Sequence, residues 1–170
     1  MTHPIVVVVP DVRSAYNVGA MLRTADAAGL AHVYCCGFTP SPVHRGVAKT
    51  ALGAQDAVPW SHHDDVYTLL DTLRARGHTL AALERAEGAR LPDQLEATHF
   101  PLALVVGNEL TGVPPDVLAA CDVVVGLPQF GVKASLNVSV AFGVAAYGIV
   151  ARYRALHGLG PAAERIGITG

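Results

Sequence analysis

The chain has 170 residues, of which 51% are hydrophobic and 15% charged, a composition that excludes a disordered chain and allows one compact domain with a sizeable core. A formal net charge of −2 argues against a strongly basic nucleic-acid binder. The acidic excess lies entirely within residues 61–100, however, which leaves basic residues elsewhere free to form a patch. No basic segment precedes an apolar run at the N-terminus, and the longest apolar stretch, residues 138–151, is shorter than the roughly 18 residues of a membrane span. We therefore expect a cytoplasmic protein without a membrane partner.

Strand-like and helix-like segments alternate along the chain. Ile5–Val9 is a continuous β-branched run, which is typical of a fully buried strand. Ser61 precedes Asp64 by three residues, as at the start of a capped helix, and Gly77 indicates where that helix ends. In chain order we predict a strand at 5–9, a helix at 17–28, a strand at 32–36, a loop at 37–43, a short helix within 44–54, a helix at 64–76, a strand at 78–83, a loop at 84–98, strands at 102–106 and 123–127 separated by a short helix opened by Pro114 and Pro115, and a final helix at 135–157.

This alternation predicts one α/β domain over residues 1–170, with a mostly parallel sheet and helices on both faces. The final helix is apolar on nearly every side, and a helix of that kind is normally buried all round. One sheet can cover only one side of it. We therefore expect a partner subunit on the other side; the alternative is a helix enclosed within its own domain.

Three unusual segments follow predicted strands, namely residues 17–24, 107–112 and 128–137. In open parallel sheets, ligands bind beyond the carboxyl ends of the strands, so the shared placement of these segments indicates one site. Taken singly, their residues have structural interpretations: Asn17 and Ser135 are typical helix caps, and Arg23 is an ordinary solvated arginine.

Glycine is unusual at three positions of these segments. Gly19 lies inside a predicted helix, where it costs roughly 1 kcal/mol relative to alanine, and it therefore indicates close approach by another backbone or by a ligand. Gly107 and Gly112 likewise allow main-chain groups to approach a planar ligand. Asn137 is a poor helix former in what should be the first helical turn.

Other chemistries lack the necessary patterns. Residues 126–131 have the spacing of a phosphate loop, but Val132 interrupts the required ending, and no dinucleotide-binding glycine pattern occurs. Residues 61–64 contain the residue types of a catalytic triad, but adjacent residues cannot form its geometry, and a helix start is the preferred interpretation. Cys35, Cys36 and Cys121 are interpreted as buried free thiols, and no spacing predicts a metal site.

The three segments together resemble the SpoU (TrmH-like) family of the SPOUT RNA methyltransferases. Their order and spacing agree with that family from Ile5 to about Tyr153. The matching motifs are Asn17-x-Gly19-x-x-x-Arg23-Thr24-Ala25, Gly107-Asn108-Glu109-x-x-Gly112-Val113, and Leu127-Pro128 followed by Ser135-Leu136-Asn137-Val138-Ser139-Val140-Ala141. Gln129 departs from the family, which often has methionine after the proline.

The resemblance implies an enzyme that methylates a ribose 2′-hydroxyl of tRNA or rRNA with S-adenosylmethionine and without a metal. It also implies a deep C-terminal trefoil knot, which pattern reasoning alone would reject, and a homodimer formed through the knot and the last helix. No separate RNA-binding domain is expected, so the core dimer or a helper protein would recognise the RNA. The cofactor site would be lined by Val106, Gly107, Asn108, Glu109, Gly112, Leu127, Pro128, Ser135 and Leu136. The catalytic positions would be Asn17, Arg23, Glu109, Ser135 and Asn137.

Arg23 matches the catalytic arginine of the family. A guanidinium is always protonated, so we favour a clamp on the phosphate next to the target ribose, which also lowers the pKa of the hydroxyl, over a general base. Ser135 or Asn137 would orient the hydroxyl. Two other interpretations stay open at this point: a catalytically silent RNA-binding dimer that retains the fold, and a small-molecule α/β enzyme that uses a nucleotide cofactor.

Overall fold

Six parallel strands form a single sheet in the computed structural model, which describes residues 1–160. The order of the strands across the sheet is β3-β2-β1-β5-β4-β6. The strands are β1 (His3–Pro10), β2 (Leu30–Cys36), β3 (Trp60–His63), β4 (Thr79–Leu83), β5 (Leu102–Val105) and β6 (Val123–Val125). The helices are α1 (Ala15–Ala28), α2 (Arg45–Ala51), α3 (Ala54–Ala57), α4 (Val66–Ala75), α5 (Pro115–Ala120) and α6 (Val138–Leu156), with short 3-10 turns at Pro92–Gln94 and Ala97–His99.

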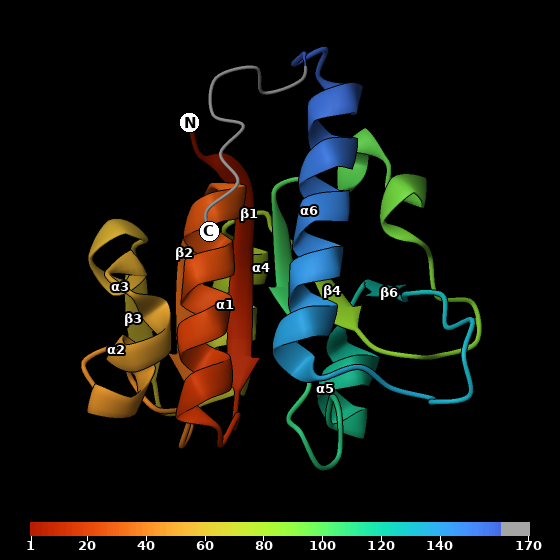
Figure 1. Ribbon diagram of the computed structural model, residues 1–170. Helices are drawn as coiled ribbons and strands as arrows, with labels where there is room; N and C mark the ends of the chain where they lie inside the picture. The colour runs from red at the N-terminus through yellow and green to blue at the C-terminus, as the bar shows by residue number, and fades with distance from the viewer. Residues whose placement is uncertain (161–170) are drawn as a thin grey trace.

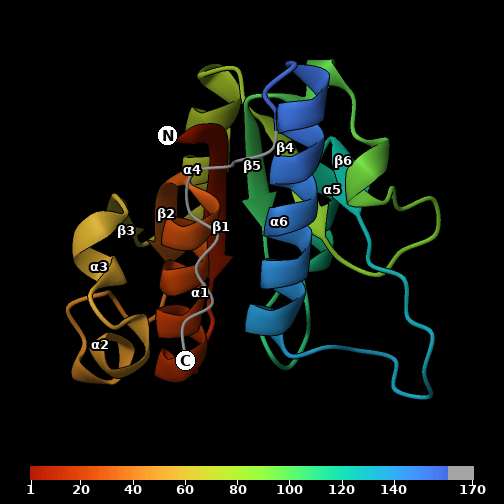
Figure 2. The same cartoon turned by 45° about the horizontal axis from the view of Figure 1, so that its top comes forward.

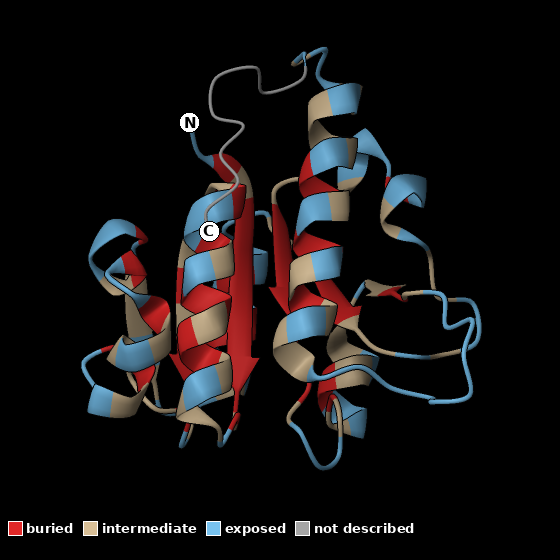
Figure 3. Cartoon of the chain, in the orientation of Figure 1, coloured by how far each residue is buried: buried red, intermediate tan, exposed pale blue. Residues whose placement is uncertain are grey.

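Helices cover both faces of this sheet, as the sequence predicts (Figure 1). Ile5, Val7 and Val9 of β1 pack in one core with α1 and α6, whereas Val6 and Val8 pack in a second core with α4 and α5. Successive side chains of a strand point to opposite faces, so a strand buried on both faces must be apolar throughout. Figure 3 shows this arrangement, with buried strands between helices that are exposed on their outer sides.

The prediction of the first helix is correct at its end and wrong at its start. Gly29 ends α1 in the left-handed conformation, but α1 begins two residues earlier than predicted. Ser14 is the N-cap, and its hydroxyl accepts a hydrogen bond from the Asn17 backbone N–H at 3.2 Å. The side chain of Asn17 is therefore not used as a cap.

The interpretation of residues 61–64 as a helix start is also wrong. Ser61 belongs to β3, an edge strand that pairs in parallel with β2. Asp65 caps α4 instead, and its carboxylate accepts hydrogen bonds from the N–H groups of Tyr67 and Thr68 at 3.2 and 3.0 Å. Because β3 is short and polar, it carries none of the apolar alternation by which strands are recognised.

Helix α6 begins three residues later than predicted, because Asn137 rather than Ser135 is its N-cap. Its buried side chains lie on one side, while Val140, Val144 and Tyr147 on the other side are 51%, 53% and 55% exposed. Within residues 1–160, the rest of the domain therefore does not enclose this helix, and the alternative interpretation is wrong. No helix in this range has both the length and the hydropathy to cross a membrane.

Gly19 permits close approach by another backbone, as its place inside a helix predicts. That backbone belongs to α2, since a Cβ on Gly19 would lie 2.9 Å from the Ala51 nitrogen. Cys35 and Cys36 are buried free thiols, and burial raises the pKa of each to about 12. Cys121 is only partly buried. Residues 161–170 of the predicted domain lie outside the described residues.

Candidate active site

The loops that follow the strands gather at one edge of the sheet, where the carboxyl ends of β1, β5, β4 and β6 lie (Figures 1 and 2). The segment 126–137 swings away from β6 and returns along this edge to the start of α6. A pocket of about 370 Å³ opens here, within the usual size range of small-molecule sites. Its lining residues are Leu83, Glu84, Arg85, Val106, Gly107, Asn108, Glu109, Leu110, Thr111, Gly112, Leu127, Gln129, Ala134, Ser135, Leu136, Val138 and Ala141.

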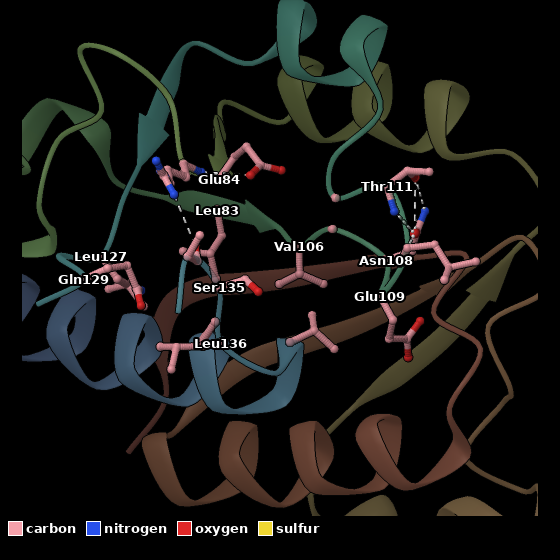
Figure 4. A pocket seen from close by; sticks show the side chains of 17 residues that line it. Leu83, Glu84, Val106, Asn108, Glu109, Thr111, Leu127, Gln129, Ser135 and Leu136 are labelled. Carbon is pink, nitrogen blue, oxygen red and sulfur yellow. Dashed lines mark hydrogen bonds between the residues drawn. The ribbon is translucent and has the colours of Figure 1, made fainter. Parts of the chain in front are cut away.

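Of the nine residues predicted for the cofactor site, all but Pro128 line this pocket. Figure 4 shows Ser135 and Leu136 on one side of it, Asn108, Thr111 and Glu109 on the other, and Val106 between them. The apolar wall therefore comes from the end of β5 and from the segment that precedes α6. Two separate sequence motifs form opposite sides of one cavity.

A tight turn shapes the side of the pocket that follows β5. Asn108 and Gly112 exchange backbone hydrogen bonds of 3.1 and 3.2 Å, and a Cβ on Gly107 would lie 2.5 Å from the Gly112 carbonyl carbon. Gly112 itself has a φ of 70°, which favours glycine. These glycines thus allow the chain to approach itself, a role that their sequence pattern does not distinguish from approach to a ligand.

Asn108 holds the same turn with its side chain. Its Oδ1 accepts hydrogen bonds from the N–H groups of Leu110 and Thr111 at 2.9 and 2.8 Å, and its Nδ2 donates to the Thr111 hydroxyl at 2.9 Å. An asparagine that bonds to the backbone two and three residues onward stabilises a turn. The amide of Asn108 is therefore committed to the shape of the pocket wall.

The carboxylate of Glu109 joins this turn to the start of α1. Its Oε2 accepts from the Arg13 backbone N–H at 3.1 Å, and its Oε1 accepts from the Ser14 N–H at 3.1 Å and the Asn17 side-chain amide at 3.0 Å. Burial opposes ionisation of this group, but the hydrogen bonds outweigh burial and hold the pKa of Glu109 below its ordinary value. The positive end of the α1 dipole favours the same ionised form.

Asn17 and Asn137 extend the network from Glu109 to α6. The Asn137 amide donates to the Asn17 Oδ1 at 3.2 Å, while the Asn137 Oδ1 accepts from the Ser139 N–H at 2.9 Å and the Ser139 hydroxyl at 2.6 Å. Neither asparagine lines the pocket. Asn17 contacts Glu109 directly, and Asn137 contacts Asn17. The first, second and third sequence segments are thus tied together by direct contacts.

Arg23 is not brought to this site within one chain. It is exposed on α1, beyond Gly19, and it does not line the pocket. Of the five predicted catalytic residues, Glu109 and Ser135 line the pocket, Asn17 and Asn137 join its network, and Arg23 stands apart.

The end of β4 also contributes to the pocket, and none of its residues is among the predicted site residues. Leu83, Glu84 and Arg85 line the pocket at the end of this strand. The Glu84 carboxylate accepts from the Val113 N–H at 2.9 Å, and the Arg85 guanidinium donates to the Ala134 carbonyl at 3.4 Å. Because β4 ends at the same edge as β5, its last residues could have been included by the rule that selected the other three segments.

Comparison with known proteins agrees with this geometry. The model of the SpoU rRNA Methylase family matches residues 4–147. The chain is 33% identical over 142 residues to the 23S rRNA (guanosine-2′-O-)-methyltransferase RlmB of Vibrio parahaemolyticus, covering 83% of this chain and 56% of that protein.

Two solved structures share the fold. The AdoMet-bound rRNA methyltransferase from Sinorhizobium meliloti superposes with a TM-score of 0.80 at 26% identity, covering 88% of this chain and 56% of that one. The A. aeolicus TrmH/SpoU tRNA modifying enzyme gives 0.80 at 28% identity, covering 92% and 78%. The chain spans a little over half the length of the RlmB relative and of the S. meliloti enzyme.

Proposed function

Since the chain belongs to the SpoU rRNA methylase family, we propose that it transfers a methyl group from S-adenosylmethionine to a ribose 2′-hydroxyl of a structured RNA, either tRNA or rRNA. The observation that carries this proposal is the convergence of the three family motifs on one pocket and its hydrogen-bond network. The named relatives, one of them bound to AdoMet, support the same reaction class and the same cofactor.

The residues of the pocket suit S-adenosylmethionine. Val106, Leu127 and Leu136 offer apolar surface to an adenine ring, while the turn at residues 107–112 offers main-chain polar groups close to the cavity. The carboxylates of Glu84 and Glu109 line the same cavity and favour a ligand that carries positive charge. When bound, the sulfonium supplies an activated methyl group and its leaving group. No metal is required for that transfer.

Glu109 acts in this proposal as a positioning residue. A carboxylate that already accepts three N–H hydrogen bonds and has a lowered pKa is a weak proton acceptor. Its task is to fix Asn17 and the start of α1 against the cofactor pocket. Ser135, which lines the pocket, and Asn137, which caps α6, then orient the ribose hydroxyl toward the methyl group.

Arg23 would reach the site from a second copy of the chain. The exposed side chains Val140, Val144 and Tyr147 form an apolar stripe on α6, and Gly143 lies between them. Helix α1 packs beside α6, so a subunit seated on this stripe would also meet the exposed face of α1. We therefore propose a homodimer in which Arg23 of one subunit clamps the phosphate next to the ribose held at the other subunit's pocket.

Three further proposals rest on the family resemblance. The segment 126–137 and α6 would form the C-terminal trefoil knot, residues 1–170 would belong to one methyltransferase domain, and the protein would work in the cytoplasm. The hydrogen bond from Arg85 to Ala134, which ties this segment to the end of β4, is consistent with a crossing of the chain at that edge.

Two measurements test the proposed function. Isothermal titration with S-adenosylmethionine should show saturable binding, and its absence would favour the silent RNA-binding interpretation. Transfer of labelled methyl groups to RNA from cells that lack the protein, followed by mapping of ribose methylation, should identify a 2′-O-methylated nucleotide.

Arg23→Ala and Arg23→Lys should both lose most methyl transfer while retaining cofactor binding, because lysine lacks the bidentate geometry. Wild-type transfer by either variant would exclude the clamp.

A further inference from the structure

Phe38 is an exposed aromatic residue at the same end of the sheet as the candidate active site. Phe38 is 59% exposed, and it lies in the loop that follows β2, the strand next to β1, at the carboxyl ends of the strands. Single exposed apolar residues are common and need no explanation by themselves. The surroundings of Phe38 set it apart.

The turn that presents Phe38 is anchored at both ends. The Phe38 N–H donates to the Asp11 carboxylate at 3.1 Å, and the Gly37 N–H donates to the His63 carbonyl at 2.9 Å. The next residue, Thr39, is 2% exposed; its hydroxyl donates to the Val9 carbonyl at 2.7 Å and accepts from the Val12 N–H at 3.1 Å.

Backbone geometry adds to this rigidity. Gly37 has a φ of 60°, and Asp11, which is not glycine, has a φ of 51°. Residues held in the left-handed region persist where their surroundings impose it, and they often mark functional loops. These contacts anchor the backbone that carries the exposed ring.

Arg13 lies over this ring and connects it to the pocket. The Arg13 guanidinium carbon is 5.7 Å from the centre of the Phe38 ring, within cation–π range. The backbone N–H of the same residue donates to Glu109, which lines the pocket. We call this pair the Phe38–Arg13 platform; the guanidinium lies over the ring, and the Arg13 backbone links the pair to Glu109 at the proposed cofactor site.

Positive charge continues from Arg13 towards the start of α2. Arg45 is exposed at the first residue of α2, and a Cβ on the adjacent Gly46 would lie 3.0 Å from the Ala15 Cβ at the start of α1. The nearby carboxylates of Asp11 and Glu109 are both engaged by backbone N–H groups. The rim therefore combines an aromatic face with cations suited to phosphates.

We propose that the Phe38–Arg13 platform stacks an unpaired base of the substrate RNA next to the nucleotide whose ribose is methylated. Single-stranded and looped RNA is recognised by stacking of exposed bases on aromatic rings and arginine planes, whereas a base inside a duplex has no free face. This inference rests on the proposed function and deepens it, because it names the residues that hold the base beside the target nucleotide.

The test uses a short single-stranded oligouridylate that carries one 2-aminopurine, whose fluorescence is quenched when its base stacks and which uracil neighbours leave largely unstacked. Wild-type protein should quench the probe, and annealing the probe to its complementary strand should abolish the effect. Phe38→Ala should weaken binding about 5- to 150-fold, the range expected from loss of one base–aromatic stack. Phe38→Leu should behave like Phe38→Ala, while Phe38→Tyr should retain quenching.

A control and a second readout separate this role from folding and from the proposed function. Tyr67→Ala, which removes an exposed aromatic from α4 on the other face of the sheet, should leave quenching unchanged. Phe38→Ala should raise the KM for RNA and leave the affinity for S-adenosylmethionine unchanged. Wild-type quenching by Phe38→Leu, or equal binding of the annealed probe, would overturn the platform. Failure of the wild-type chain to bind S-adenosylmethionine would overturn the proposed function instead.

Discussion

Glu109→Gln tests the central contact of the candidate site. Glutamine keeps one oxygen, which can still accept from Ser14 and Asn17, but it places an NH₂ group where Oε2 accepts the Arg13 N–H. One hydrogen bond to a charged acceptor is therefore lost, together with the attraction to the α1 N-terminus. Because Glu109 is exposed and water can replace part of this interaction, we expect a loss of about 1 kcal/mol at pH 7.

The stability difference between the wild type and Glu109→Gln should depend on pH. The pKa of Glu109 is lowered in the folded chain from its ordinary value of 4.5, so the unfolded chain takes up the proton first as the pH falls. The stabilising contribution is fully present above that ordinary value and is lost as the pH falls through the lowered pKa. The stability difference between the wild type and Glu109→Gln should therefore shrink steadily below pH 4.5.

Urea unfolding followed by circular dichroism at neutral and acidic pH measures this difference, and about 1 kcal/mol corresponds to roughly 2–4 °C in Tm for a domain of this size. Glu87→Gln is the matched control, because it changes an exposed carboxylate that lies outside the pocket lining. Equal stabilities of the wild type and Glu109→Gln at pH 7, or a difference that does not change with pH, would refute the assigned role of the carboxylate.

Gly107, two partly buried histidines and the exposed face of α6 each offer a further test. Gly107→Ala places a Cβ 2.5 Å from the Gly112 carbonyl carbon, so we expect about 1–3 kcal/mol of destabilisation in urea unfolding and weaker binding of S-adenosylmethionine. The control Gly131→Ala should change neither, because the space around Gly131 is open. Burial lowers the pKa of His32, with the nearby His63 and Arg76 adding to the shift, and burial also lowers the pKa of His78. Because the folded chain then binds fewer protons than the unfolded chain, the free energy of unfolding should fall as the pH drops below 6.5, and a flat profile between about pH 7 and pH 5 would contradict this. Val144→Arg, on the exposed face of α6, should yield a folded monomer in light scattering, and an unchanged mass would remove the proposed dimer contact.

The central strands and most helix ends could be predicted from local patterns. The β-branched run of β1 requires a strand buried on both faces, and Gly29 ends α1 because a left-handed residue is needed there. The incorrect predictions of strands and helix starts also have local causes. β3 is polar and recognisable only through its pairing with β2, while Ser14, Asp65 and Asn137 compete with neighbouring capping residues that the sequence does not rank.

The order and spacing of three motifs in the sequence determined which loops belong to the site, and eight of the nine predicted cofactor residues line one pocket. Only the tertiary structure decided how they meet. Glu109 contacts Asn17 across 92 positions, Arg85 enters from β4, and Arg23 stays outside the pocket of its own chain. Sequence patterns report local conformation and burial, whereas the order of strands in the sheet determines which distant side chains come within hydrogen-bond distance.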